Sequence, residues 1–140
     1  MRFWDSSAVV PLLCEEAESA RMRALLREDP ALLVWWGTPI ECASALARGQ
    51  RDGKVPAESA QQAISRLRDA MLEWATVPAS PDVREQSIRL LRVHRLRAAD
   101  AMQLAAAIVG SDFQPSALEL VTLDDRLAEV ADLEGFRVRR

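Results

Sequence analysis

The sequence is poor in the residues on which several common chemistries depend. His94 is its one histidine, so a mechanism that needs two histidines as general base and general acid is excluded. No serine has a histidine and an acid arranged as in a catalytic triad. The two cysteines, Cys14 and Cys42, are too few for a disulfide framework, and no CxxC or Cys/His spacing indicates zinc. Both lie among apolar residues on expected helices, which favours buried structural roles.

Long apolar runs and an excess of positive charge are also missing. No apolar run approaches the roughly 18 residues that a membrane span needs. Asp5, Glu15 and Glu16 interrupt the first apolar stretch, which therefore lacks the core of a signal peptide, and we expect a cytoplasmic protein. A net charge of −3 and a pI near 5.2 are not the basic signature typical of a nucleic-acid-binding protein.

The basic residues that are present are unusual in kind. Lys54 is the only lysine, and all the other basic residues are arginines. Arginine is suited to bidentate contacts with phosphate, but a run of arginines is also typical of a solvated helix face. Both interpretations stay open for the cluster around His94, a residue that we expect at the surface. The clustered arginines are Arg84, Arg89, Arg92, Arg95 and Arg97, and three more close the chain at Arg137, Arg139 and Arg140.

Short β-like runs alternate with helical patterns along the whole chain. A chain of 140 residues that is 49% hydrophobic fits a single domain spanning residues 1–140. Strands separated by helices form mainly parallel sheets with helices on both faces, so the sequence predicts an α/β fold. We expect strands at 2–4, 32–36, 74–77, 118–123 and 136–138, and helices at 6–15, 18–28, 38–49, 56–73, 81–94, 98–110 and 126–132.

Acidic residues stand where several of these strands give way to helices. Such sheets bind their ligands beyond the carboxyl ends of the strands, so these junctions are the first candidates for a site. Asp5 follows the first strand, and Asp124 and Asp125 follow the strand that ends at Leu123. Glu41 lies in the first turn of the helix after the second strand.

Asp100 differs from the other acids because it lies near the start of an alanine-rich helix. The run 98–107 carries no other charge, so its helix is expected to be largely buried. A charge there is costly unless it is paired or binds a metal.

Each acid also has a purely structural interpretation. Asp5 and Asp124 could cap the helices that follow them, and Asp100 could interact with the dipole of its own helix. Glu41 could form a capping box with Thr38, which precedes Pro39.

The four acids taken together favour a metal site. Four carboxylates that converge in one crevice repel one another, and a divalent cation removes that repulsion. Ligands that are all oxygen favour Mg²⁺ or Mn²⁺ over zinc or copper. Such a site can activate water and orient a phosphodiester.

Four segments carry a resemblance to a known family, namely Phe3–Ala8, Pro39–Glu41, Arg97–Ala105 and Val121–Asp124. The segment around Asp100 and the Thr-x-Asp segment are the most specific parts. With these segments the chain resembles the PIN domains along its whole length, and its size and motif spacing are similar to those of VapC-type toxins of bacterial toxin–antitoxin pairs.

This resemblance implies a three-layer PIN-like fold with about five mainly parallel strands between helices. It implies an endoribonuclease that cleaves RNA with water activated by Mg²⁺, or by Mn²⁺ as a substitute. It also implies a VapB-type antitoxin that blocks the site, and commonly a homodimer. The residues carried over by position are Asp5, Glu41, Asp100 and Asp124 as catalytic and metal-binding acids, Ser7 as a polar helper and Arg97 as a substrate contact. Asp125 adjoins Asp124, but the threonine two residues earlier favours Asp124.

Three other functions compete with this interpretation. A phosphoryl-accepting receiver domain needs a lysine late in the chain, and the sole lysine, Lys54, lies in mid-chain. A haloacid-type phosphatase needs Asp-x-Asp after the first strand, where this chain has Asp5-Ser6-Ser7. A PIN-like module that binds RNA or protein without cutting stays open, as does the choice between one and two metal ions.

Overall fold

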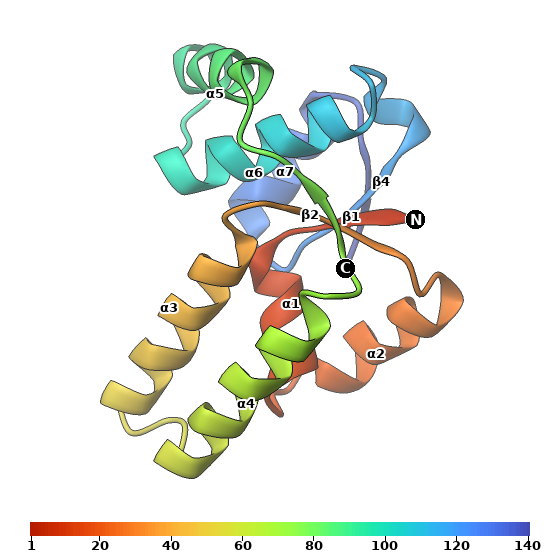
Figure 1. Ribbon diagram of the computed structural model, residues 1–140. Coiled ribbons are helices and arrows are strands. Elements are labelled where there is room, and N and C mark those ends of the chain that lie inside the picture. The colour runs from red at the N-terminus through yellow and green to blue at the C-terminus, as the bar shows by residue number, and fades with distance from the viewer.

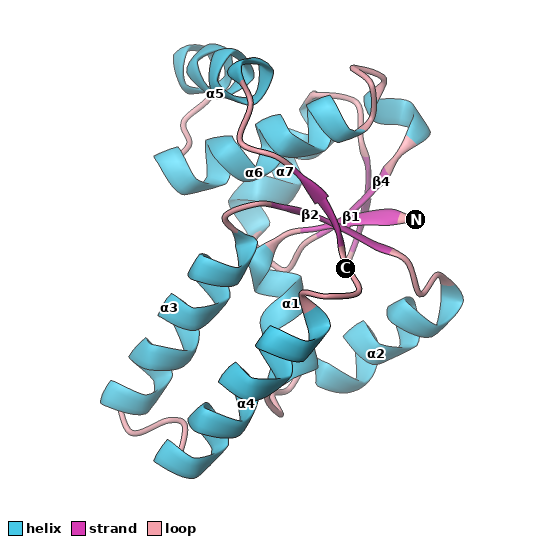
Figure 2. Ribbon diagram, viewed as in Figure 1, coloured by secondary structure: helices cyan, strands magenta, loops and turns pink.

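A twisted five-stranded sheet between two layers of helices forms the centre of the protein (Figures 1 and 2). The computed structural model describes residues 1–140, and every neighbouring pair of strands in it is parallel. This arrangement confirms the expected α/β class with five parallel strands. In spatial order the strands are β3 (Ala75–Val77), β2 (Leu32–Trp35), β1 (Arg2–Trp4), β4 (Glu119–Val121) and β5 (Arg137–Arg139).

Seven α-helices alternate with the strands, and their bounds lie within a few residues of those predicted. A 3₁₀ turn at Pro115–Ala117 had no counterpart in the prediction. None of the helices combines the length and the apolar character of a membrane-spanning segment. The helices are α1 (Ser6–Leu13), α2 (Ser19–Glu28), α3 (Thr38–Arg51), α4 (Ala57–Ala70), α5 (Pro81–Val93), α6 (Ala98–Gly110) and α7 (Asp125–Leu133).

The alternation of side chains along each strand divides the core between the two faces of the sheet. On β1, Phe3 packs with residues of α5, α6 and α7, whereas Trp4 packs with residues of α1 to α4. Both side chains are completely buried. Successive residues of a strand point to opposite faces, so apolar residues at consecutive positions serve both layers. Helices α3 and α4 run side by side away from the sheet (Figure 1).

The start of α3 differs from the expected capping box. Thr38 is the first residue of the helix rather than its cap, and its side chain makes no capping hydrogen bond. Its buried hydroxyl instead accepts a hydrogen bond from Nε2 of Gln103 in α6, at 3.1 Å. A buried hydroxyl needs a partner, and α6 supplies one that the local sequence cannot reveal. The predicted capping box between Thr38 and Glu41 therefore does not form.

The N-cap of α1 is Asp5, one of the two roles considered for this acid. Two other local predictions were wrong in detail. Trp36 is 57% exposed, because β2 ends at Trp35 and the next side chain turns outward. His94 is largely shielded, since its Nε2 lies 2.6 Å from a carboxylate oxygen of Glu134. Cys14 and Cys42 are buried, as expected.

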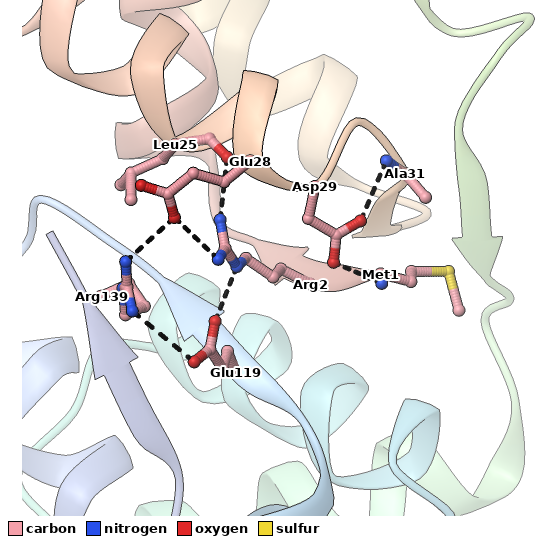
Figure 3. A network of polar contacts seen from close by, with 8 residues as sticks. All are labelled: Met1, Arg2, Leu25, Glu28, Asp29, Ala31, Glu119 and Arg139. Carbon is pink, nitrogen blue, oxygen red and sulfur yellow. Dashed lines mark hydrogen bonds and ion pairs between the residues drawn. The ribbon is translucent and has the colours of Figure 1, made fainter.

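A network of ion pairs around Arg2 joins β1 to α2, β4 and β5 (Figure 3). The Arg2 guanidinium donates to Glu119 at 2.6 Å, to Glu28 at 3.0 Å and to the carbonyl oxygen of Leu25 at 2.8 Å. Arg139 lies 3.1 Å from Glu28 and 3.8 Å from Glu119. Arg2 is only 11% exposed, so its charge depends on these partners for solvation.

Replacing Arg2 with Met is expected to destabilise the protein, because Glu28 and Glu119 lose their most buried partner. Breaking a buried ion pair costs about 3–5 kcal/mol, and since Arg139 still neutralises both glutamates we expect roughly 2–4 kcal/mol. Urea unfolding measures the change. Arg23→Met is the matched control: it removes an exposed pair with Glu15 and should leave the urea midpoint nearly unchanged. Equal losses in the two variants would contradict a structural role for the Arg2 network.

Candidate functional site

A cavity of about 790 Å³ opens at the carboxyl ends of β1 and β4. Its walls come from α1, α3, α6, the loop between α5 and α6, and the start of α7. This is the position at which a parallel α/β sheet holds a ligand. Three of the four predicted acids line the cavity, namely Glu41, Asp100 and Asp124.

Asp5, the fourth predicted acid, lies behind the cavity wall as the N-cap of α1. Its carboxylate accepts hydrogen bonds from the Ser7 backbone N–H at 3.1 Å and from the Ser7 hydroxyl at 2.7 Å. The side chain is almost completely buried, and this burial raises the pKa of Asp5 to about 6. The bonds from Ser7 oppose that rise, and the nearby charge of Glu41 adds to it. Asp5 is thus a helix cap and a buried acid beside other acids at the same time.

Ser7 connects the two strand ends that carry Asp5 and Asp124. Its hydroxyl oxygen also accepts the backbone N–H of Leu123 at 2.8 Å and lies 3.3 Å from the hydroxyl of Thr122. The Thr122 hydroxyl in turn accepts the N–H of Asp124 at 3.1 Å. Ser7 therefore fixes the loop after β4 relative to the turn after β1.

The structure distinguishes Asp124 from its neighbour Asp125. Asp124 lines the cavity and caps α7, where Oδ1 accepts the N–H of Leu127 at 2.7 Å. Its Oδ2 has no protein partner. The Asp125 side chain is 93% exposed and pairs with Arg140 at 2.6 Å. Of the two acids, only Asp124 is placed to act in the cavity.

Glu41 and Asp100 face the cavity from the first turns of α3 and α6. Oε2 of Glu41 accepts a hydrogen bond from the Ser6 hydroxyl at 2.9 Å. Burial raises the pKa of Glu41, and the charge of Asp100 raises it further. Burial likewise raises the pKa of Asp100, with an added contribution from Asp124. The four acids thus form a continuous series of mutually repelling neighbours.

The donor chemistry of this site fits a hard divalent cation. Every acid contributes carboxylate oxygens, hydroxyls of Ser6 and Ser7 stand among them, and neither histidine nor cysteine lines the cavity. No three acidic, histidine or cysteine side chains lie close enough together to hold one ion between them. Mg²⁺ usually keeps several waters and binds through only one or two carboxylates. The acids therefore do not form a closed cage, and an ion held here would keep part of its water shell.

Arginines surround the acids at the cavity wall. Arg97, the predicted substrate contact, lines the cavity together with Arg95 from the same loop. Arg48 and Arg126 also line it and were missed by the sequence analysis. Two features of the sequence could have revealed them. Glu41 and Arg48 are seven residues apart, which places both on one face of α3, and Arg126 follows Asp124 by two residues.

Most of these cavity arginines have no internal counter-ion. Arg48, Arg95 and Arg97 form no ion pair, and Arg126 lies 3.6 Å from Glu129. The predicted arginine cluster therefore divides, because Arg89 is bound by Glu134 away from the cavity. Positive groups without partners beside an acidic centre can bind the phosphates of a polyanion while a metal ion occupies the centre.

Comparison with known proteins identifies the family of the chain. The family model of the PIN domain matches residues 2–133. The chain is 31% identical over 145 aligned positions to the ribonucleases VapC45 and VapC49 of Mycobacterium tuberculosis, covering 97% of this chain and 92% of theirs.

Solved structures with the same fold span the whole chain. The M. tuberculosis toxin VapC20, described as cleaving the sarcin-ricin loop, superposes with a TM-score of 0.71 at 17% identity, covering 100% of both chains. A toxin–antitoxin complex from Klebsiella pneumoniae superposes with a TM-score of 0.67 at 19% identity, and the match covers 100% of this chain and 97% of that one. FitAcB from Neisseria gonorrhoeae gives 0.68 at 16% identity with the same coverage. The chain belongs to the PIN domain family, and its curated relatives are ribonucleases of the VapC type.

Proposed function

We propose that this protein is a magnesium-dependent endoribonuclease that acts as the toxin of a toxin–antitoxin pair. The observation that carries the proposal is the cavity itself, which is lined by three acids from separate segments, has Asp5 buried behind its wall, and carries arginines of which most form no internal ion pair. Similarity to VapC ribonucleases along nearly the whole chain supports the same activity. Arginines and a metal site suit a nucleic acid, whose phosphodiesters they can bind. We take RNA as the substrate class because the curated relatives are ribonucleases.

The four acids would bind the cation in different ways. Asp5 and Asp100 would anchor the principal Mg²⁺, while Glu41 and Asp124 would bind it through water or hold a second ion. Mn²⁺ could replace Mg²⁺, since both prefer oxygen ligands. The bound ion would supply Lewis-acid stabilisation of the charge that develops on the scissile phosphate. Ser7 keeps Asp5 oriented and Arg97 contacts the RNA, so that the phosphodiester lies above the acids.

The proposed partner is a VapB-type antitoxin that covers the cavity and blocks access to the acids. The neighbour from K. pneumoniae is described as a toxin–antitoxin complex, which supports a protein partner here. The charge pattern of the cavity favours an inhibitor that brings an arginine to the acids, because a guanidinium can take the place of the cation.

A PIN-like module that binds RNA or protein without cutting is the second candidate. The absence of a preformed cluster of three metal ligands is the observation that favours it. Inducible expression in a host without the antitoxin distinguishes the two functions. A nuclease toxin arrests growth and loses that effect in Asp100→Asn, whereas arrest by a binding module is unchanged.

Asp100→Asn is expected to abolish most RNA cleavage, because it removes charge from a principal metal-binding acid and leaves the side-chain size unchanged. Loss of a group that only supports the metal ligands lowers metal affinity or activity by about 10–100-fold, so we expect the cleavage rate to fall by at least about 100-fold. The rate is measured on a fluorogenic RNA in the presence of Mg²⁺. Asp125→Asn is the matched control and should cleave at nearly the parental rate, since Asp125 points to Arg140. A folded Asp100→Asn protein that cleaves as fast as the parent contradicts the assignment.

Asp5→Asn is expected to stabilise the metal-free protein at neutral pH. The folded-state pKa of Asp5, about 6, lies above its ordinary value of 3.8, so the folded protein binds this proton more tightly. The free energy of unfolding therefore falls as pH rises from about 4 to 6, and the whole penalty is present above pH 6. Asparagine keeps the helix cap without the charge, so the variant should gain roughly 1–3 kcal/mol at pH 7.5 and nothing below pH 4.

Urea unfolding of both proteins in EDTA, at a series of pH values, measures this difference. Added Mg²⁺ should narrow it at pH 7.5, because a cation that binds only the folded parent stabilises it by mass action. A constant difference between the variant and the parent at all pH values would show that the Asp5 charge is not the cause.

Arg48→Gln is expected to weaken RNA binding equally for all sequences, because an arginine without an internal partner contacts phosphate rather than bases. Fluorescence anisotropy in the uncleaving Asp100→Asn background measures binding to a single-stranded RNA at several KCl concentrations. The slope of log K against log salt should fall by about 0.7, the value for one phosphate contact on a single strand. Arg68→Gln, on the exposed part of α4, should leave both affinity and slope unchanged. Identical slopes for the two variants would place Arg48 outside the RNA path.

A further inference from the structure

One carboxylate joins the end of α5 to the end of α7. Nε2 of His94, the C-cap of α5, lies 2.6 Å from Oε1 of Glu134, the C-cap of α7. Arg89, also in α5, donates to both oxygens of the same carboxylate, at 3.2 Å and 2.6 Å. The side chains of His94 and Glu134 are only 14% and 15% exposed. Two groups of α5 thus hold one largely shielded acid of α7.

The hydrogen bond between His94 and Glu134 is charge-assisted. Hydrogen bonds from Arg89 hold the pKa of Glu134 below its usual range, and the bond to His94 lowers this pKa further, while burial opposes both. The carboxylate is therefore ionised at neutral pH and can only accept, so Nε2 of His94 carries the proton. Hydrogen bonds to ionised groups are roughly twice as strong as those between neutral groups. This bond therefore holds the end of α5 against α7.

Only three residues separate His94 from α6, which packs against α5 (Figure 1). The N–H of Leu96 donates to the carbonyl oxygen of His94 at 3.1 Å, and the Leu96 side chain packs against the apolar core. Arg95 and Arg97, on either side of Leu96, are exposed and line the acidic cavity. Neither arginine forms an internal ion pair, so the backbone of this loop determines where the two side chains can reach.

Helix α7 connects the same bond to the acids of the cavity. Its N-cap is Asp124, which lines the cavity, and its C-cap is Glu134. A helix is a spacer of fixed length, because each residue advances it by about 1.5 Å. The contact between His94 and Glu134 therefore sets the position of the loop arginines relative to an acid of the proposed metal site.

Two other roles for His94 agree less well with the structure. A direct contact with RNA, or a role as general acid, needs a ring that faces the cavity. His94 does not line the cavity, and its Nε2 is held by Glu134. A role in fold stability alone predicts that every destabilising change in α5 affects RNA binding in the same way, and a matched variant can test that.

We propose that His94 is a positioning residue for RNA binding. Its hydrogen bond to Glu134 holds the loop of residues 95–97 so that Arg95 and Arg97 face the cavity together. The proposal rests on the proposed nuclease function for its ligand, an RNA strand. The positioning itself is a property of the protein without RNA.

Removal of the hydrogen bond tests this role in the Asp100→Asn background, where RNA binds without being cut. His94→Leu should weaken the binding of a single-stranded RNA, measured by fluorescence anisotropy. The slope of log K against log salt should fall by up to about 1.4, since each of two phosphate contacts contributes about 0.7. His94→Gln should retain the parental slope, because the glutamine amide can donate to Glu134 from nearly the place of Nε2.

The effect should depend on the two arginines. In a background that already carries Arg95→Gln and Arg97→Gln, His94→Leu should cause no further loss of affinity, because residues that act through one another are not additive. A further loss in that background overturns the proposal, since His94 would then act on RNA binding by another route.

Ser80→Ala is the matched control for the stability of α5. Ser80 caps the helix at its other end, where its hydroxyl accepts the N–H of Val83 at 3.3 Å. Its loss should lower the urea midpoint, as His94→Leu does, but leave the salt slope unchanged. An equal loss of slope in Ser80→Ala and His94→Leu overturns the proposal, and so does a loss in His94→Gln as large as in His94→Leu.

Amide hydrogen exchange of the protein without RNA separates this proposal from the nuclease function. Exchange in the peptide that covers residues 95–101 should be faster in His94→Leu than in the parent and parental in His94→Gln, because the loop opens when its anchor is lost. Unchanged exchange in His94→Leu overturns the proposal whatever happens to RNA binding. A parent that binds no RNA contradicts the nuclease function, while faster exchange in His94→Leu would still support the positioning of the loop.

Discussion

The repulsion among four carboxylates is the constraint on which the functional part of this protein depends. Parallel strands bring their carboxyl ends to one edge of the sheet, so acids placed after β1 and β4 must meet there. Ser7 fixes the two strand ends relative to one another, because its hydroxyl donates to Asp5 and accepts the backbone N–H of Leu123 after β4. The raised pKa values of Asp5, Glu41 and Asp100 reflect burial first and mutual charge second. We propose that a bound cation relieves this repulsion.

Buried charge is compensated differently at the two ends of β1, around Arg2 and around Asp5. Around Arg2, positive and negative side chains neutralise one another, and the network joins β1, α2, β4 and β5 (Figure 3). Around Asp5 the neighbouring acids form no ion pair with the arginines of the cavity wall, and we propose that a cation from outside neutralises them. The first region stabilises the fold, whereas the second is the proposed active site.

Much of the fold could be predicted from the sequence, because the apolar runs of the strands and the periodicity of the helices are local signals. The candidate acids could also be predicted, since strand ends are visible in the pattern and Asp100 is the one charge in an alanine-rich run. Contacts between residues that lie far apart in the sequence could not be predicted. Thr38 binds Gln103, which is 65 residues away, and His94 meets Glu134 across 40 residues. Arg48 was missed because its place on the cavity wall depends on where α3 lies.

The double role of Asp5 has a consequence for how such a protein can lose its activity over evolutionary time. The same carboxylate that belongs to the acidic series also begins α1, where Oδ2 accepts the N–H of Ser7. A relative that has lost activity by replacement of Asp5 keeps α1 capped only if asparagine or serine stands in its place. Silent relatives should therefore carry those residues here far more often than alanine or valine.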